Sequence, residues 1–144
     1  MISIEKIKKD FKYIEDRENG DFYGGTWSTT RQNSKFELFF NAKFKEIEQT
    51  QIENFELFMK NQEEIATEIE SIIKSKISKN PIKDSDKVLN GILEFDIVSV
   101  LQSGGEYDIE LICSKNYKTF LSKKRVDYVV AIRKGKIKEF LDMN

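Results

Sequence analysis

Five carboxylates are the residues of this sequence whose types and spacing are suited to chemistry. Glu94 and Asp96 alternate with apolar residues in "GILEFDIV", Asp108 and Glu110 do so in "EYDIELIC", and Asp127 lies in "RVDYVV". Because side chains two residues apart share a face of a strand, the apolar residues would face the core and the carboxylates would face away. We therefore expect one acidic outer face, with carboxylates that are neighbours across strands: Glu94, Asp96, Asp108, Glu110 and Asp127.

Three interpretations of this acidic face remain open. The plainest is a solvated sheet face, because antiparallel sheets often keep one face in water. A second is a docking surface for a basic partner protein, since complementary charge speeds association and sets specificity. A third is a divalent-metal site with hydrolytic activity, but no lysine follows Glu110 at the spacing typical of nucleases. We predict the protein-binding surface, without a metal or a cofactor.

Apolar residues also fall on the face that is expected to be wet. In the strand pattern these are Phe39, Val98 and Ile112. They would surround the carboxylates with apolar surface, which is how a protein interface is usually composed.

The chain has no histidine and a single cysteine, Cys113. Histidine is the side chain most often used for proton transfer near neutral pH and the commonest metal ligand. This composition excludes a structural zinc site, a Ser-His-Asp triad and a Cys-His dyad within one chain. Chemistry based on carboxylates alone survives, as in a paired-acid glycosidase or a magnesium site. We expect a protein without enzymatic activity.

The C-terminal third is basic and offers two alternatives to protein binding. Lys123, Lys124 and Arg125 could contact phosphates of a nucleic acid, with Tyr117 or Phe120 stacking on bases. The formal net charge of −1 and the pI of about 5.7 speak against a dedicated nucleic-acid binder. The other alternative is a homo-oligomer, a dimer formed through an exposed sheet edge.

The only tryptophan, Trp27, follows a glycine pair, Gly24-Gly25. One interpretation is a ligand-binding loop whose recognition surface is Trp27 with Tyr23 and Phe22. Two adjacent glycines without the rest of a phosphate-binding motif are a weak signal for a ligand. We favour packing, with Trp27 covering a sheet edge or a helix end and the glycines marking a bulge or a close backbone approach.

The first part of the chain predicts one short helix and then strands. Apolar residues at helical spacing from Ile4 to Ile14 predict a short amphipathic helix, although residues 11–15 could already be strand. Asn19-Gly20 predicts a hairpin turn that returns the chain into a strand at residues 22–28. Strict alternation predicts a further half-buried strand over residues 35–44.

The middle of the chain predicts one long helix. Thr50 and Glu53 fit a capping box at its start, and apolar residues follow at three- and four-residue steps from Ile52 to Ile77. Asn80-Pro81 ends the helix, because the residue before proline avoids helical angles.

After a polar link at residues 83–87, three strands and a short terminal helix follow. The strands are predicted at residues 93–101, 107–113 and 126–132, with a tight turn at Ser103-Gly104-Gly105 between the first two. The terminal helix is suggested by Ile137, Phe140 and Leu141.

These elements predict an α+β fold: an antiparallel sheet of about five to six strands, one long helix packed on one face, and short terminal helices. The length fits a single globular domain over residues 1–144. No run approaches the roughly 20 apolar residues that a membrane span requires, so no membrane partner is expected. The lone cysteine cannot form an intramolecular disulfide, and the N-terminus lacks the apolar core of a signal peptide, so we expect a cytoplasmic protein.

The order of elements around "GILEFDIV", a glycine turn and "EYDIELIC" resembles a group of small, uncharacterised bacterial domains. Some members of that group act as immunity proteins beside polymorphic toxins. The likeness covers residues 22–135 as a pattern and includes an aromatic-Asp pair, here Tyr107-Asp108. It implies a protein that binds and neutralises a toxin without catalysis, and the acidic face then suggests that the toxin is basic.

Overall fold

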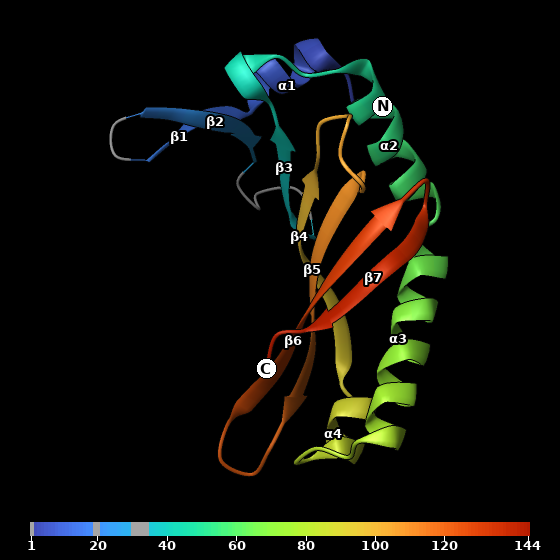
Figure 1. Ribbon diagram of the computed structural model, residues 1–144. Helices are drawn as coiled ribbons and strands as arrows, with labels where there is room; N and C mark the ends of the chain where they lie inside the picture. Colours follow the sequence, from blue (N-terminus) through green and yellow to red (C-terminus); the bar gives the residue numbers. More distant parts are fainter. Residues whose placement is uncertain (1, 19–20, 30–34) are drawn as a thin grey trace.

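The computed structural model describes residues 2–18, 21–29 and 35–144, and the side chains of these residues except 16–18, 21–24 and 44. Within the described residues the chain forms seven strands that join in one sheet (Figure 1). The strands are β1 Lys12–Glu18, β2 Asp21–Ser28, β3 Glu37–Asn41, β4 Ile92–Val100, β5 Ile109–Lys118, β6 Lys123–Arg133 and β7 Lys136–Asp142. The turn predicted at Asn19-Gly20 lies outside the described residues.

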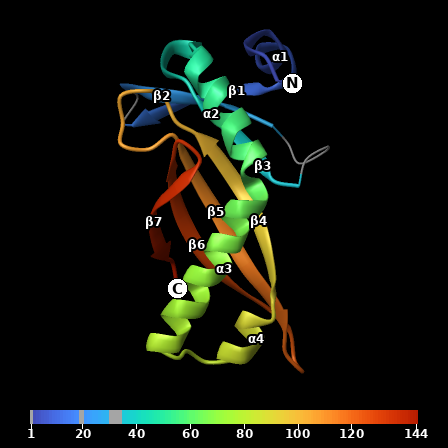
Figure 2. The same ribbon diagram turned by 90° about the vertical axis from the view of Figure 1, so that its right-hand side faces the viewer.

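The described helices cover one face of this sheet and leave the other open. The helices of the described part are α1 Ile4–Asp10, α2 Gln49–Lys60, α3 Gln62–Lys79 and α4 Ser85–Leu89, with a 3-10 turn η2 at Lys43–Lys45. Figure 2 shows α2 and α3 running along the same face of the sheet, with α4 at its lower end. None of the described helices is both long and apolar enough to cross a membrane.

The strands follow one another across the sheet in chain order, and all neighbours are antiparallel except β3 and β4. These two are parallel because the segment from η2 to α4 carries the chain back before β4 begins, and a parallel pair needs such a crossover. The predicted α+β class is therefore confirmed, with seven strands instead of five or six.

The N-terminal helix is confirmed over Ile4–Asp10, and residues 12–15 belong to strand β1, as the alternative for this segment had it. The side chain of Ser3 accepts a hydrogen bond from the Lys6 amide at 3.2 Å and caps α1. The predicted C-terminal helix is wrong, because this segment is strand β7. Lys134 and Gly135 adopt positive φ angles of 49° and 75°, which reverse the chain so that β7 pairs with β6.

The single long helix of the prediction is two helices that meet at Asn61. The predicted end at Asn80 is confirmed. The predicted capping box at Thr50 is wrong, because Glu48 is the N-cap residue and Gln51 completes the box. The sequence predicts a polar link with no helix or strand at residues 83–87, but this segment contains most of α4.

The hydrophobic core lies between the helices and the sheet. From the helices it takes a stripe of residues at three- and four-residue spacing: Ile52, Phe55, Phe58, Ile65, Ile69, Ile73 and Ile77. From the central strands it takes alternate residues: Val98, Val100, Ile109, Leu111, Cys113, Val126, Tyr128, Val130 and Ile132. These two periodicities explain why the elements were readable from the sequence.

Trp27 packs in this structure, as the packing interpretation predicted. It is 8% exposed, and its ring lies 5.2 Å from that of Tyr13. Gly25 is a point of close approach, because a Cβ atom there would lie 1.9 Å from the Tyr13 hydroxyl oxygen. The side chains of Tyr23 and Phe22 lie outside the described part.

The buried thiol of Cys113 gives a direct test of the core. Burial, helped by the nearby carboxylates of Asp96, Asp127 and Glu70, raises the pKa of Cys113 to about 12. We expect Ellman's reagent to label native Cys113 at least about 100-fold more slowly than the urea-unfolded chain, since the reactive thiolate is scarce and enclosed. Labelling of the native protein at the unfolded rate would contradict this placement of the strand.

Candidate functional site

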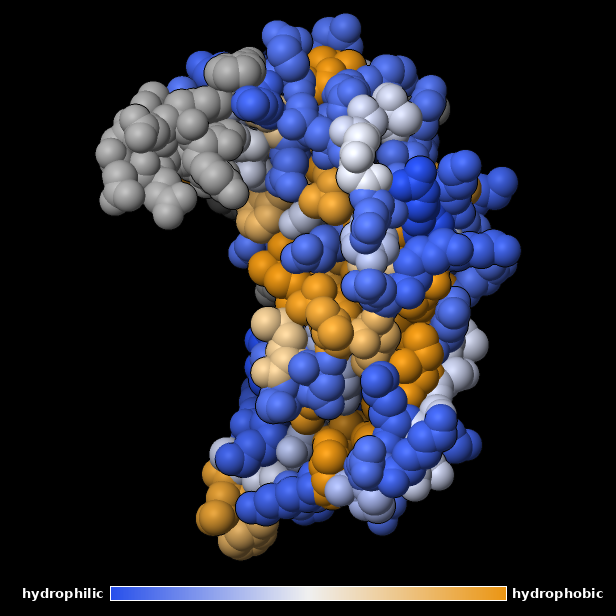
Figure 3. Space-filling model, viewed as in Figure 1, coloured by the Kyte–Doolittle hydropathy of each residue, from blue (hydrophilic) through white to orange (hydrophobic). Residues whose placement is uncertain are grey.

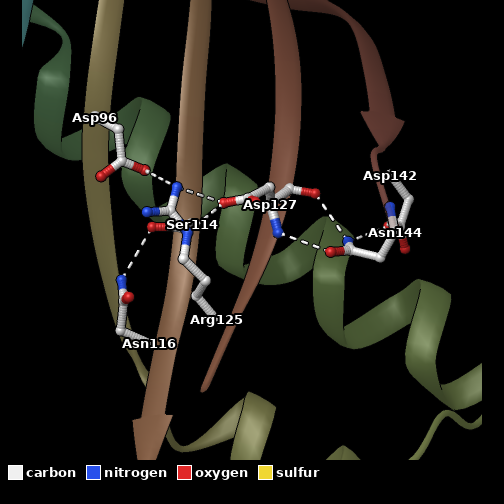
Figure 4. A network of polar contacts seen from close by, with 7 residues as sticks. All are labelled: Asp96, Ser114, Asn116, Arg125, Asp127, Asp142 and Asn144. Carbon is white, nitrogen blue, oxygen red and sulfur yellow. Dashed lines mark hydrogen bonds and ion pairs between the residues drawn. The ribbon is translucent and has the colours of Figure 1, made fainter. Parts of the chain in front are cut away.

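The face of the sheet opposite α2 and α3 carries four of the carboxylates singled out in the sequence, Glu94, Asp96, Glu110 and Asp127, and we call it the outer face. Figure 4 views it with the helices behind the strands. Its side chains come from β3, β4, β5, β6 and β7, at the positions that alternate with the core residues. No described helix packs on this side of these strands (Figures 1 and 2).

An apolar row crosses the middle of the outer face. Ile97, Ile112, Val129 and Leu141 are partners in successive strand pairs, so their side chains lie side by side. The first three are half-buried and Leu141 is 58% exposed. Figure 3 shows apolar side chains gathered over the middle of the sheet, between more polar regions above and below.

A bulge in β4 creates this row. The pairing with β5 shifts between Phe95 and Ile97, so that Asp96 is an extra residue. Such a bulge changes which face the following side chains take. Phe95 therefore contacts Phe58 of α2 with ring centres 5.9 Å apart, while Ile97 joins the outer face. The prediction that Phe95 and Ile97 share the core face is wrong for this reason.

Arg125 organises the polar half of the outer face, as Figure 4 shows. Its Nε donates to the Asp127 carboxylate at 2.7 Å, and its Nη2 lies 2.6 Å from the same oxygen and 3.6 Å from Asp96. The hydrogen bond to Asp127 and the charges of both aspartates raise the pKa of Arg125. Asp96 is only 7% exposed, so it holds this guanidinium more than it presents charge.

The C-terminal residue closes this network. The Asn144 side chain donates to the backbone oxygen of Asp127 at 2.9 Å and accepts from its amide at 3.1 Å, which extends the pairing of β7 with β6. The Asn144 backbone and side chain both donate to Asp142. On β5, Asn116 donates to Ser114 at 2.9 Å.

The five predicted carboxylates do not form one acidic cluster. Glu94 is exposed and lies opposite Ser114, and Glu110 is exposed and lies opposite Ser99. Residues that pair across a hairpin lie about equally far from its turn. Glu94 and Asp96 lie further from the turn between β4 and β5 than Asp108 and Glu110 do, so these carboxylates do not become cross-strand neighbours. Asp108 lies in the loop before β5, where its carboxylate accepts from the Lys134 amide at 2.7 Å.

The three residues of the nucleic-acid alternative begin β6, where alternation puts Lys123 and Arg125 on one face and Lys124 on the other. Arg125 is engaged on the outer face, as described above, and pairs in register with Asn116. Lys123 and Lys124 are exposed at the start of the strand and lie opposite Lys118 and Tyr117.

Of the apolar residues expected on the outer face, Phe39 and Ile112 lie there and Val98 does not. Phe39 is half-buried and lies opposite Ser99, while Val98 is fully buried in the core beyond the bulge. Val129 was not singled out in the sequence, and Leu141 was assigned to the predicted terminal helix. The sequence does contain a sign of the role of Val129, because it is an apolar residue at an outward position between two core residues of β6.

The described residues contain no group of three or more His, Cys, Asp or Glu side chains placed to hold a metal ion. Comparison with known proteins finds no matching family model, no similar curated protein and no similar solved structure. The fold and the outer face therefore define the class no further than an α+β domain with one helix-covered and one open sheet face.

Proposed function

We propose that this protein is a non-enzymatic protein-binding domain that docks a basic partner protein on its outer face. The observation that carries the proposal is the apolar row of Ile97, Ile112, Val129 and Leu141 on a sheet face that no described helix covers. A contiguous exposed apolar patch with a polar rim is typical of interaction sites.

The surroundings of the row support docking in two ways. On one side Arg125 is held in place by Asp127, and arginine held in a defined position loses little further freedom when a partner binds. On the other side Glu110 and Glu139 lie on either side of Ala131 in register. With Glu94 these exposed glutamates favour a partner whose contact surface is basic.

The resemblance to immunity proteins gives the proposal a specific form, in which the basic partner is a toxin that this chain neutralises. Neutralisation needs only tight binding over the toxin's functional surface, so it requires no catalytic group here. This form predicts that the partner inhibits growth when expressed alone and is harmless when co-expressed with the unaltered chain.

Site-specific photo-crosslinking in the native cell tests the surface assignment. Benzoylphenylalanine placed at Leu141 reports on the outer face, and the same residue placed at Ser75, exposed on α3, is the matched control. We expect a discrete crosslinked species from the Leu141 position alone. Equal crosslinking from both positions, or none from Leu141, would contradict the assignment. A species of twice this chain's mass would instead indicate a homodimer.

A charge at the β7 end of the row should weaken the interaction. We expect Leu141→Asp to weaken partner binding by at least about 100-fold, since an unpaired carboxylate that becomes buried in an interface costs several kcal/mol. The control Ser75→Asp should bind normally, and both variants should melt within a few degrees of the unaltered chain. If the partner is a toxin, cells that express it should be protected by the Ser75→Asp variant and not by the Leu141→Asp variant. Undiminished binding by Leu141→Asp would contradict the proposal.

A further inference from the structure

The hairpin between β5 and β6 ends in a turn that exposes two large apolar side chains. Phe120 is 100% exposed and Leu121 is 88% exposed. The turn is braced from both sides: the Thr119 amide donates to the Ser122 oxygen at 2.8 Å, and the Ser122 amide donates to the Thr119 hydroxyl at 3.1 Å. The hydrogen bonds thus hold a conformation in which both apolar side chains face water.

The turn of this hairpin, which we call the tip, is the lowest point of the ribbon in Figure 1, and Figure 3 shows hydrophobic atoms at the same place, next to hydrophilic ones. Full exposure of an aromatic and an aliphatic side chain next to each other is unfavourable in water. Contact of this end of the molecule with an apolar environment would explain the exposure of these two side chains.

Lysines surround the tip. Lys118 and Lys123 are directly opposite each other in the last pair of the hairpin, and Lys124 follows. Like charges in that position are destabilising unless a counter-charge lies near. In the described part of the chain, no carboxylate lies within ion-pair distance of these three lysines.

A groove of about 670 Å³ lies beside the tip and adds a fourth lysine, Lys87 of α4. Both views of the fold show α4 and the hairpin at the same end of the molecule, away from the β1–β2 hairpin (Figures 1 and 2). The groove is also lined by Asn90 and Asn116 and by one carboxylate residue, Glu94.

We propose that this end of the molecule docks on an anionic membrane surface. Phe120 and Leu121 enter the boundary between headgroups and acyl chains, and the four lysines contact lipid phosphates. Exposed apolar side chains within a basic surround are the combination that interfacial binding requires, and each lysine adds electrostatic attraction to anionic lipid. That none of the described helices could cross a membrane does not bear on such contact, which needs only the tip.

A nucleic acid fits these observations less well. The lysines could contact its phosphates, and Phe120 could stack on a base. Leu121 has no π-face to stack and would remain in water. The adjacent aromatic and aliphatic pair is therefore accounted for by a lipid surface and not by a nucleic acid.

Sedimentation with lipid vesicles tests the proposal on the full chain. Vesicles of phosphatidylcholine with about one-third phosphatidylserine should retain the protein at low salt, and pure phosphatidylcholine vesicles should retain at least about tenfold less. We expect the double variant Phe120→Ser/Leu121→Ser to lose about tenfold in partitioning, because it removes the apolar contribution. Lys123→Gln/Lys124→Gln should lose a similar factor at low salt and less at high salt.

The matched control is Ile14→Ser/Met59→Ser, which removes two other exposed apolar side chains elsewhere on the molecule and should partition normally. All variants change exposed residues, so their melting temperatures should agree. A dye on Leu121→Cys, selective because Cys113 is buried, should shift its emission to the blue on anionic vesicles.

Three results would overturn the proposal. The first is failure to bind anionic vesicles at low salt. The second is full binding by Phe120→Ser/Leu121→Ser together with an unshifted dye at Leu121, which would leave only general electrostatic attraction. The third is a preference for duplex DNA over anionic vesicles that does not depend on Phe120 or Leu121, which would assign the lysines to a nucleic acid.

Discussion

Replacing Gln51 by leucine should lower the free energy of unfolding by about 3 kcal/mol, because buried backbone groups would lose their hydrogen-bond partner. Gln51 is fully buried at the start of α2. Its amide nitrogen donates to the backbone oxygen of Asn41 at 2.8 Å and to that of Val100 at 3.1 Å, and its oxygen accepts from the Glu48 amide at 2.9 Å. One side chain thus caps a helix and joins the ends of the parallel strands β3 and β4.

Leucine has a similar volume, so the expected loss comes from hydrogen bonding and not from a cavity. Gln49→Leu, an exposed change two residues earlier, is the matched control and should alter stability by less than about 0.5 kcal/mol. Urea unfolding followed by circular dichroism measures both. A loss below about 1 kcal/mol for Gln51→Leu would show that these backbone groups find water or other partners.

The second large effect concerns the buried ion pair between β5 and α3. Lys115 is 1% exposed, and its ammonium lies 2.8 Å from both carboxylate oxygens of Glu70, with the Leu89 backbone oxygen at 3.3 Å. Glu70→Gln should cost about 3 kcal/mol of stability, because a buried ammonium loses its counter-charge. Lys115→Met should leave the free energy of unfolding nearly unchanged. The substitution removes the buried charge and its desolvation cost together, and the Glu70 carboxylate remains in contact with water.

The two substitutions should therefore be strongly non-additive. Glu70→Gln in the Lys115→Met background is expected to cost less than about 1 kcal/mol, since no buried charge remains to be stranded. The double-mutant cycle is measured by urea unfolding in low and high salt, and the coupling should change little with salt because the pair is shielded from solvent on the lysine side. Equal costs of Glu70→Gln in both backgrounds would contradict a role for this pair in the core.

The class of fold follows from patterns that need only neighbouring residues. Alternation in β3, β5 and β6 and helical spacing from Ile52 to Ile77 each bury one face, so an α+β domain was the expected result. The end of α3 before Pro81 is equally local, because proline restricts the angles of the residue preceding it. The positions of these elements could therefore be read without knowing what they pack against.

The arrangement of the outer face was decided by contacts between segments far apart in the chain. Ile137, Phe140 and Leu141 fit a helix by spacing, but pairing with β6 makes them strand, since a free strand edge offers a whole row of hydrogen bonds. The extra residue at Asp96 has no local signature, because a bulge is defined by the register of the partner strand.

That one-residue shift moved Ile97 from the core to the outer face, and it placed Asp96 beside Arg125. Local chemistry thus settled which segments are helix and strand, while strand pairing settled which side chains meet. The physical reason is that side-chain periodicity is a property of each strand alone, whereas register depends on two strands together.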